Sequence, residues 1–235
     1  MDEKDREILI FLRDETFSTT ELLSQVSRLK RSATYVRVKN LEKDGFIKQS
    51  DIPFEVTSRG YLPIWGLTRE GARLAASDGY FDYFDAENIS IITMAHSIAL
   101  QRRKVIAIGA GWGQWLSSRR MRQIAHKAPS IWVQVPDALA VSPKGQKVAI
   151  EIERTKKTPK RYEEIMSNYC QMLLDKTIDQ VIYICPEKIT PAIEDYFLRV
   201  EAIFVNGRIQ PVHKSFRKRF IFLSYDEWKI QVKNI

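Results

Sequence analysis

Three carboxylates in the middle of the chain have a spacing from which metal chemistry can be built. Asp137 ends a β-branched run that begins at Ile131, and Glu151 and Glu153 follow within the run VAIEIE. Alternate side chains of a β-strand point to opposite faces, so the two glutamates share one face of the second run. Two carboxylates on one face of an apolar, central strand are costly to bury unless a cation neutralises them.

A divalent cation can supply that charge. Mg²⁺ prefers hard oxygen ligands, commonly one or two carboxylates completed by water and phosphate oxygens. The sequence therefore predicts an Mg²⁺ or Mn²⁺ site formed by Asp137, Glu151 and Glu153, which can assist phosphodiester cleavage. The alternative is that Glu151 and Glu153 lie on a solvated edge strand and pair with Arg154 or Lys157.

The elements that would position these acids lie in residues 82–235. Hydrophobic periodicity predicts helices alternating with strands. The predicted elements around the acids are a helix over 87–103 with His96 inside it, the segment Val105–Ala110, a Gly-rich bend, a strand followed by a turn over 112–124, a helix over 158–174, a buried strand over 180–185 and a helix over 190–201.

Residues 1–77 carry a different pattern, which predicts short helices followed by a two-stranded wing. The predicted order is a helix over 3–15, a second helix begun by a capping box at 18–21, a third over 32–44 that stops at Gly45, a strand from Phe46, a polar loop through Gly60, an apolar strand over 61–67 and a helix opening at Thr68. The segment LEKDGFIK, followed by WGLTREGARLA, resembles the winged-helix family of DNA-binding modules.

The third predicted helix and its surroundings are basic. Residues 28–48 contain seven Lys or Arg against Glu42 and Asp44. The second helix of a helix-turn-helix enters the major groove, where basic residues hold the phosphates. The predicted DNA contacts on this helix are Arg31, Tyr35, Lys39 and Lys43. The alternative is a winged helix that serves as a protein–protein adaptor.

The formal net charge of +8 comes from the second half of the chain. Residues 1–80 contain 13 Lys or Arg and 13 Asp or Glu, whereas residues 81–235 contain 24 and 16. Such an excess suits a polyanionic partner, and three basic clusters flank the acids. The clusters are Arg119/Arg120/Arg122, Arg154/Lys156/Lys157/Lys160/Arg161 and Lys214/Arg217/Lys218/Arg219, and DNA contact is predicted for Arg119, Arg120, Lys156, Lys157, Lys160 and Arg161.

The setting predicted from composition is cytoplasmic, without membrane insertion. No apolar run is long enough to span a bilayer, and the acidic start from Asp2 to Asp5 excludes a secretory signal peptide. Cys170 and Cys185 lie in apolar surroundings without metal-ligand spacing, so both are expected to be reduced core residues.

The residues PDA, followed by EIE, resemble the PD-(D/E)xK superfamily of restriction-endonuclease-like enzymes. The resemblance implies that Asp137 and Glu151 are metal ligands. Its third motif position is usually Lys and here is Glu153, which we interpret as a ligand or general base; strand alternation aims Lys156 at the other face. The expected fold is α+β, with a winged helix over 1–77 joined to a restriction-endonuclease-like α/β domain with a central mixed sheet over 82–235.

The joint pattern is similar to the replication-relaxation group and, within it, to the MOBC-class plasmid mobilisation relaxases. The shared features are the winged helix, the helix with Met94-Ala95-His96-Ser97, Trp115, PDA, EIERT, Arg161-Tyr162 and Tyr169. The resemblance implies an endonuclease that nicks one strand at a plasmid transfer origin during conjugation, with a coupling protein as a possible further partner. It also implies Tyr162 or Tyr169 as the nucleophile, with His96 among the catalytic residues; metal-activated water is the alternative nucleophile.

Two other functions stay open at this point. One is a plasmid replication or transcription regulator whose nuclease-like domain is inactive. The other is an endonuclease that cuts both strands, which would need a dimer or two active sites.

Overall fold

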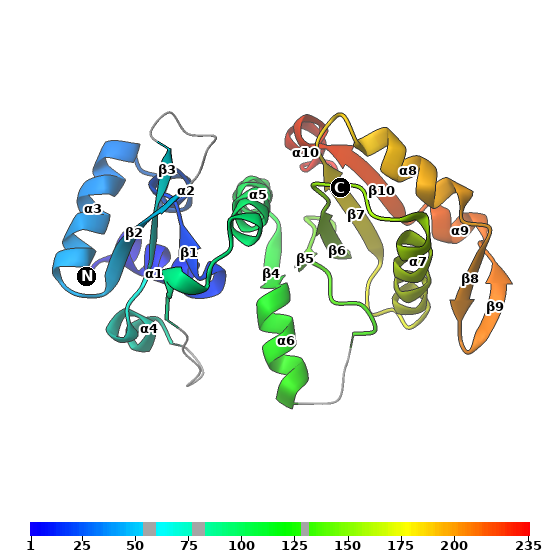
Figure 1. Ribbon diagram of the computed structural model, residues 1–235, viewed down its shortest axis with the longest axis horizontal. Helices are drawn as coiled ribbons and strands as arrows, with labels where there is room; N and C mark the ends of the chain where they lie inside the picture. Colours follow the sequence, from blue (N-terminus) through cyan, green and yellow to red (C-terminus); the bar gives the residue numbers. More distant parts are fainter. Residues whose placement is uncertain (54–59, 77–82, 128–131) are drawn as a thin grey trace. The chain divides into compact units, whose positions relative to one another are not determined.

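A computed structural model describes residues 1–53, 60–76, 83–127 and 132–235, which divide into two compact units, Met1–Val105 and Ile106–Ile235 (Figure 1). The boundary therefore falls inside helix α5 (Ile91–Gly109) and not between residues 77 and 82 as predicted. The predicted helix over 87–103 correspondingly begins later, at Ile91, and continues through the segment that was expected to follow it, up to Gly109.

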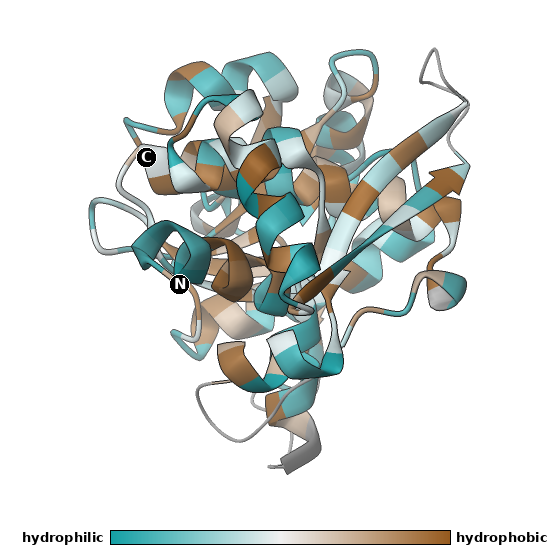
Figure 2. Cartoon of the chain, turned by 90° about the vertical axis from the view of Figure 1, so that its left-hand side faces the viewer, coloured by the Kyte–Doolittle hydropathy of each residue, from teal (hydrophilic) through white to brown (hydrophobic). Residues whose placement is uncertain are grey.

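The first unit contains three helices, a small antiparallel sheet and a fourth helix. The sheet has the strand order β1-β3-β2. The elements are α1 (Glu3–Glu15), β1 (Phe17–Ser18), α2 (Thr20–Ser27), α3 (Arg31–Lys43), β2 (Ile47–Pro53), β3 (Tyr61–Leu67), α4 (Arg69–Ala75) and the short 3-10 helix η1 (Ala86–Asn88). The helical turns that face the viewer in Figure 2 alternate between hydrophilic and hydrophobic bands, as amphipathic helices do.

Local sequence accounts for where the first helices begin and end. The α2 N-cap is Thr19, whose side chain accepts a hydrogen bond from the Leu22 N–H, so the cap lies one residue later than the predicted box. After α3, Gly45 has φ +78°, and the N–H groups of Gly45 and Phe46 donate to the carbonyls of Glu42 and Leu41. This left-handed residue ends the helix where the sequence predicted.

Buried polar contacts attach the first part of α5 to this unit. Lys104 Nζ lies 2.6 Å from Glu15 Oε1, and both side chains are almost fully buried. Ser18 Oγ donates to Gln101 Oε1, and Gln101 Nε2 donates to the Phe17 carbonyl. Buried polar groups are stable only when they are paired, so these contacts hold residues 91–105 in the first unit.

The second unit is built on a five-stranded mixed sheet with the order β10-β7-β6-β5-β4. Strands β6, β7 and β10 are parallel, whereas β4, β5 and β6 are antiparallel neighbours. The elements are β4 (Gly113–Ser117), α6 (Ser118–Lys127), β5 (Ala138–Val141), β6 (Lys147–Ile152), α7 (Pro159–Leu174), β7 (Gln180–Cys185), α8 (Thr190–Arg199), β8 (Ala202–Val205), β9 (Arg208–Pro211), α9 (Lys214–Arg217), β10 (Phe220–Ser224) and α10 (Tyr225–Gln231).

Helices α7 and α8 cover one face of this sheet (Figure 1), and their apolar residues share a core with Ala149 of β6 and Val181 of β7. Ile150 and Ile182 point to the other face and are also fully buried. Strand β6 is therefore central and buried on both faces, as the sequence predicted. Both cysteines are buried and free, which confirms that prediction.

Two predictions about this unit are corrected. The β-branched run before Asp137 begins at Ile131, outside the described residues, and its described part, residues 132–137, is irregular; β5 begins only at Ala138. The turn predicted within 112–124 is replaced by helix α6. Across the described parts of the chain, none of the helices has the length and apolar character needed to cross a membrane.

Candidate nucleic-acid interface and carboxylate site

Helices α2 and α3 form a helix-turn-helix. The connecting turn is Arg28–Lys30, and Arg28 takes the left-handed conformation with φ 56°. Thr34, Val38 and Leu41 of α3 are buried, so the opposite side of the helix faces outward. Arg31, Tyr35 and Lys43 are exposed there, and the Tyr35 side chain is 49% exposed. These positions match the predicted outward residues.

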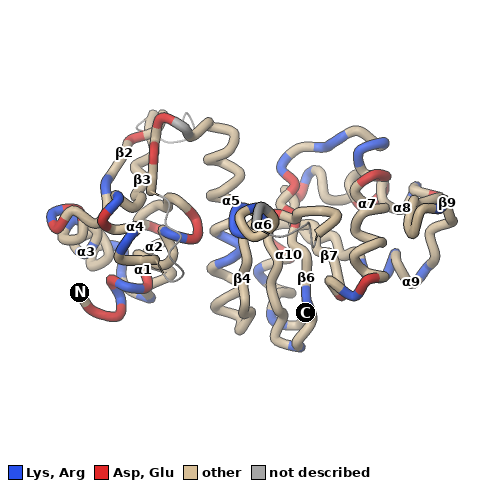
Figure 3. The backbone as a smooth tube through the Cα atoms, turned by 90° about the horizontal axis from the view of Figure 1, so that it is seen from below, with Lys and Arg blue, Asp and Glu red and all other residues tan. Residues whose placement is uncertain are grey.

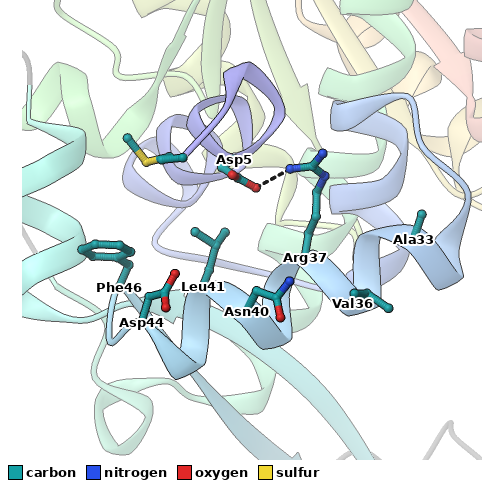
Figure 4. Close-up of a pocket in the computed structure, with 9 residues that line it drawn as sticks. Asp5, Ala33, Val36, Arg37, Asn40, Leu41, Asp44 and Phe46 are labelled. Carbon is teal, nitrogen blue, oxygen red and sulfur yellow. Dashed lines mark hydrogen bonds and ion pairs between the residues drawn. The ribbon is translucent and has the colours of Figure 1, made fainter.

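Two basic residues of α3 are already paired within the unit. Arg37 forms ion pairs with Asp2, the N-cap of α1, and with Asp5 in the first turn of that helix. Its Nη1 lies 2.6 Å from Asp5 Oδ1 (Figure 4). Lys39 pairs with Glu42 at 2.6 Å and lies over the Trp65 ring. Arg37 therefore fixes α3 against α1, while Lys39 can reach a phosphate only in competition with Glu42.

The α1–α3 contact also shapes a pocket, which Figure 4 shows at the side of α3. Its lining is formed by Met1, Asp5, Ala33, Val36, Arg37, Asn40, Leu41, Asp44 and Phe46. Asp5 and Arg37 in this lining neutralise one another, and Asp44 adds a further acidic group. This side of α3 is thus less positive than the side that carries Arg31, Tyr35 and Lys43.

In the second unit, Asp137 and Glu151 lie next to one another because β5 and β6 are paired. Ala138 is the partner of Ile150, which places Asp137 opposite Glu151 at the end of this antiparallel pair. Asp137 Oδ2 accepts a hydrogen bond from the Ile152 N–H at 2.8 Å. A carboxylate held by the backbone of the neighbouring strand is fixed in place, although one of its oxygens is partly used.

Glu151 is the most perturbed acid of the site. The buried hydroxyl of Tyr169 donates a hydrogen bond to Glu151 Oε1. The pKa of Glu151 is nevertheless raised well above its ordinary value, first by burial and second by the negative charge of Asp137. Glu151 therefore loses its proton only at a cost, and a cation beside the pair would reduce that cost.

Glu153 has a separate partner. It is buried, and its Oε2 accepts a hydrogen bond from the Lys157 ammonium, so this acid forms an ion pair within the chain. Within residues 1–53, 60–76, 83–127 and 132–235, no three His, Cys, Asp or Glu side chains form a group that could hold a metal ion. The structure thus brings Asp137 and Glu151 together, but the three predicted ligands do not meet as one set.

The edge-strand alternative for these glutamates is therefore half right. Lys157 is the partner of Glu153, as that alternative proposed, but β6 is the central strand of the sheet. Lys157 can return to the acids because β6 ends at Ile152, so strand alternation no longer applies to the residues that follow. Sequence reasoning missed that the chain turns back towards the acids after β6 ends.

The two candidate tyrosine nucleophiles are core residues of α7. Tyr162 and Tyr169 are both fully buried. Tyr162 accepts a hydrogen bond from the Lys157 N–H and stacks on Tyr196, and burial raises its pKa to about 12. Burial also raises the pKa of Tyr169 well above its usual value. Both effects oppose a tyrosinate that attacks DNA.

A third tyrosine lies on the same face and was not singled out from the sequence. Tyr183 of β7 is the register partner of Glu151. Its hydroxyl is buried and has no hydrogen-bond partner among the residues that the structure describes. Burial raises its pKa first, followed by the charges of Glu151 and Glu153. A polar group buried next to the acids without a partner indicates room for a further polar group there.

The other predicted contacts fall in several places. Lys156, Lys157, Lys160 and Arg161 are exposed around the connection from β6 into α7, where Figure 3 shows blue segments. Arg119 and Arg120 lie half-buried on α6. His96 lies half-buried on the part of α5 that belongs to the first unit, whereas Asp137 and Glu151 belong to the second.

Comparison with known families agrees with the first unit. Residues 1–48 match the family of winged helix-turn-helix DNA-binding domains. This segment covers α1, α2, α3 and the start of β2, so the chain carries a winged helix-turn-helix DNA-binding domain at its N-terminal side. No curated protein matches the chain.

Proposed function

We propose that this chain binds a specific duplex through its winged helix-turn-helix and cleaves one strand of that DNA with a divalent cation. The observation that carries the proposal is the half-buried pair of Asp137 and Glu151, in which burial and the negative charge of Asp137 raise the pKa of Glu151. Strongly perturbed acids of this kind cluster at functional sites. A plasmid transfer origin is the proposed target, and a relaxase is the proposed class of enzyme.

The residues present fit a cation held by two carboxylates. Mg²⁺ commonly binds one or two protein carboxylates and completes its shell with water and phosphate oxygens. Asp137 and Glu151 provide those carboxylates, and the hydroxyl of Tyr183 is an additional buried polar group beside them. When bound, Mg²⁺ or Mn²⁺ would polarise the phosphodiester and stabilise charge on the leaving oxygen.

The protein's own groups would orient the reacting strand. The Ile152 N–H and the Tyr169 hydroxyl hold Asp137 and Glu151 in place. Lys157, beside Glu153, brings a positive charge close to the acids, and the exposed Lys156, Lys160 and Arg161 extend that charge along the connection into α7. Such a line of cations favours a phosphate backbone. The burial of Tyr162 and Tyr169 favours water as the nucleophile.

The test is incubation of the full chain with supercoiled plasmid that carries or lacks the proposed origin, with Mg²⁺ or Mn²⁺ or with chelator. We expect nicked circles only with metal, and more of them when the origin is present. Asp137→Ala/Glu151→Ala should lower nicking at least about 10³-fold, because loss of charge stabilisation at a reacting phosphate has effects of that size. Glu163→Ala, at an exposed acid of α7, is the matched control. Full nicking by the double variant would refute the site.

The same assay identifies the nucleophile. Tyr162→Phe and Tyr169→Phe each remove one hydroxyl and leave the ring in the core. We expect both variants to retain nicking. We also expect that the protein shows no covalent DNA adduct on a denaturing gel. A covalent protein–DNA adduct that disappears in one of these variants would assign that tyrosine as the nucleophile.

A second function is favoured by one specific contact. The ion pair of Lys157 with Glu153 supplies a cation from within the chain, which is a way to stabilise the acids without a metal. The chain would then be a winged-helix regulator that binds DNA and leaves it intact. Origin-specific binding together with metal-independent thermal stability and no nicking would support this function.

A further inference from the structure

The β8–β9 hairpin packs against α7 and is hydrogen-bonded to it. It lies on the side of α7 that faces away from the five-stranded sheet (Figure 1). Its two-residue turn is Asn206-Gly207, with φ values of 50° and 73°, which suit the tight hairpin turn that matches strand twist. The Phe204 N–H donates to Ser167 Oγ and the Asn206 N–H donates to Gln171 Oε1. These bonds fix the hairpin to the helix.

One face of the hairpin is buried and the other is apolar and exposed. Ile203 and Val205 pack into the α7 core. On the opposite face, Phe204 is 59% exposed and Ile209 is 78% exposed. These two residues are register partners, so their side chains lie next to each other across the strands. Together they form a small apolar platform.

The chain segment that contains this platform is basic. Residues 202–225 contain five Lys or Arg and no Asp or Glu. Arg217 is used within the fold, because its guanidinium donates to the carbonyls of Phe197, Leu198 and Val200. Arg208, Lys214 and Lys218 are exposed, and the described part of the chain provides no side-chain hydrogen bond or ion pair for them.

We propose that the hairpin and α9 bind an unpaired DNA strand, with a base stacked on Phe204 and Ile209 and phosphates held by Arg208, Lys214 and Lys218. Single-strand binding surfaces combine aromatic platforms with positive charge, because every base has an apolar face and every phosphate a negative charge. Bases within a duplex are covered by their neighbours, so the flat platform favours an unpaired strand. This surface is additional to the winged helix and to the acids, and its proposal depends on neither.

The experiment measures binding of a labelled 20-nucleotide single strand of mixed sequence, without metal, by the full chain. Phe204→Ser/Ile209→Ser should raise the Kd about tenfold, which is the effect of losing one base stack. Arg208→Ala and Lys218→Ala should each reduce the slope of log K against log salt by about 0.7. Ile230→Ser, at an apolar α10 residue that is 73% exposed, is the matched control. All variants concern exposed side chains, and thermal melting checks that they fold.

A second measurement locates the strand directly. An oligonucleotide with 5-iodouracil should crosslink to the peptide that carries Phe204, and mass spectrometry should identify it. Unchanged single-strand affinity in the Phe204→Ser/Ile209→Ser variant, or equal loss in Ile230→Ser, overturns the proposal. If the Phe204→Ser/Ile209→Ser variant loses binding to vesicles of anionic lipid and keeps its full affinity for DNA, the platform binds a membrane, and this result overturns the proposal as well. Asp137→Ala/Glu151→Ala should bind the single strand normally, which separates this surface from the nuclease site.

Discussion

Glu15 in the first unit and Glu151 in the second have opposite electrostatic surroundings. In the first unit, the buried Glu15 is compensated by the buried Lys104 at 2.6 Å. In the second unit, Glu151 lies beside Asp137, and the like charge raises its pKa. A compensated pair holds a fold together, whereas two acids that oppose each other create a demand for a cation. The comparison therefore separates a structural anchor from a candidate site.

The anchor should show the largest effect on stability. Lys104→Ala leaves Glu15 buried without its partner and should destabilise the first unit by about 3–5 kcal/mol. Glu15→Gln/Lys104→Met removes both charges and should cost much less, since an apolar or neutral replacement avoids the uncompensated charge. Urea denaturation followed by tryptophan fluorescence measures both. Equal losses in the two variants would show that packing, not charge pairing, holds α5 in the first unit.

Removing the charge of Glu151 should stabilise the fold, whereas Lys104→Ala should destabilise it. The pKa of this acid is raised in the folded protein above its ordinary value of 4.5, so its stabilising contribution is complete below that pH and is lost as pH rises through the folded pKa. Glu151→Gln cannot ionise and should raise Tm by about 3 °C or more at pH 8, while the difference should shrink towards pH 4. Melting curves across pH test this, with Glu163→Gln as the exposed control. A lower Tm for Glu151→Gln at pH 8 would place Glu151 in a compensated network like that of Glu15.

The smallest effects are expected at the exposed cations of α3. Lys43→Ala removes a side chain that is free to reach DNA and should reduce the salt slope of duplex binding by about 0.9. Lys39→Ala should reduce it by less, because Lys39 is paired with Glu42. Binding isotherms between low and physiological salt measure both slopes. Equal slopes for Lys39→Ala and Lys43→Ala would show that the Glu42 pair opens fully on DNA.

Local patterns were sufficient to predict the winged helix. The spacing of buried residues, the Thr and Gly caps and the apolar strand over 61–67 determine elements whose contacts are close in sequence. The same kind of pattern misplaced the boundary at 77–82, because α5 is attached through Gln101 and Lys104 to residues more than 80 positions earlier. The periodicity of neighbouring residues carries no information about contacts between residues so far apart in the sequence.

The acids show the same division. The sequence by itself determined that Glu151 lies in an apolar, central strand, because strand alternation is a property of the backbone, but it placed Asp137 at the end of a strand that does not form and Glu153 inside a strand that ends at Ile152. Only the tertiary structure decided their partners: β5–β6 pairing placed Asp137 beside Glu151, α7 brought Tyr169 to Glu151, and the end of β6 allowed Lys157 to reach Glu153. Charges interact through space, so the character of each acid depends on groups that folding brings to it from elsewhere in the chain.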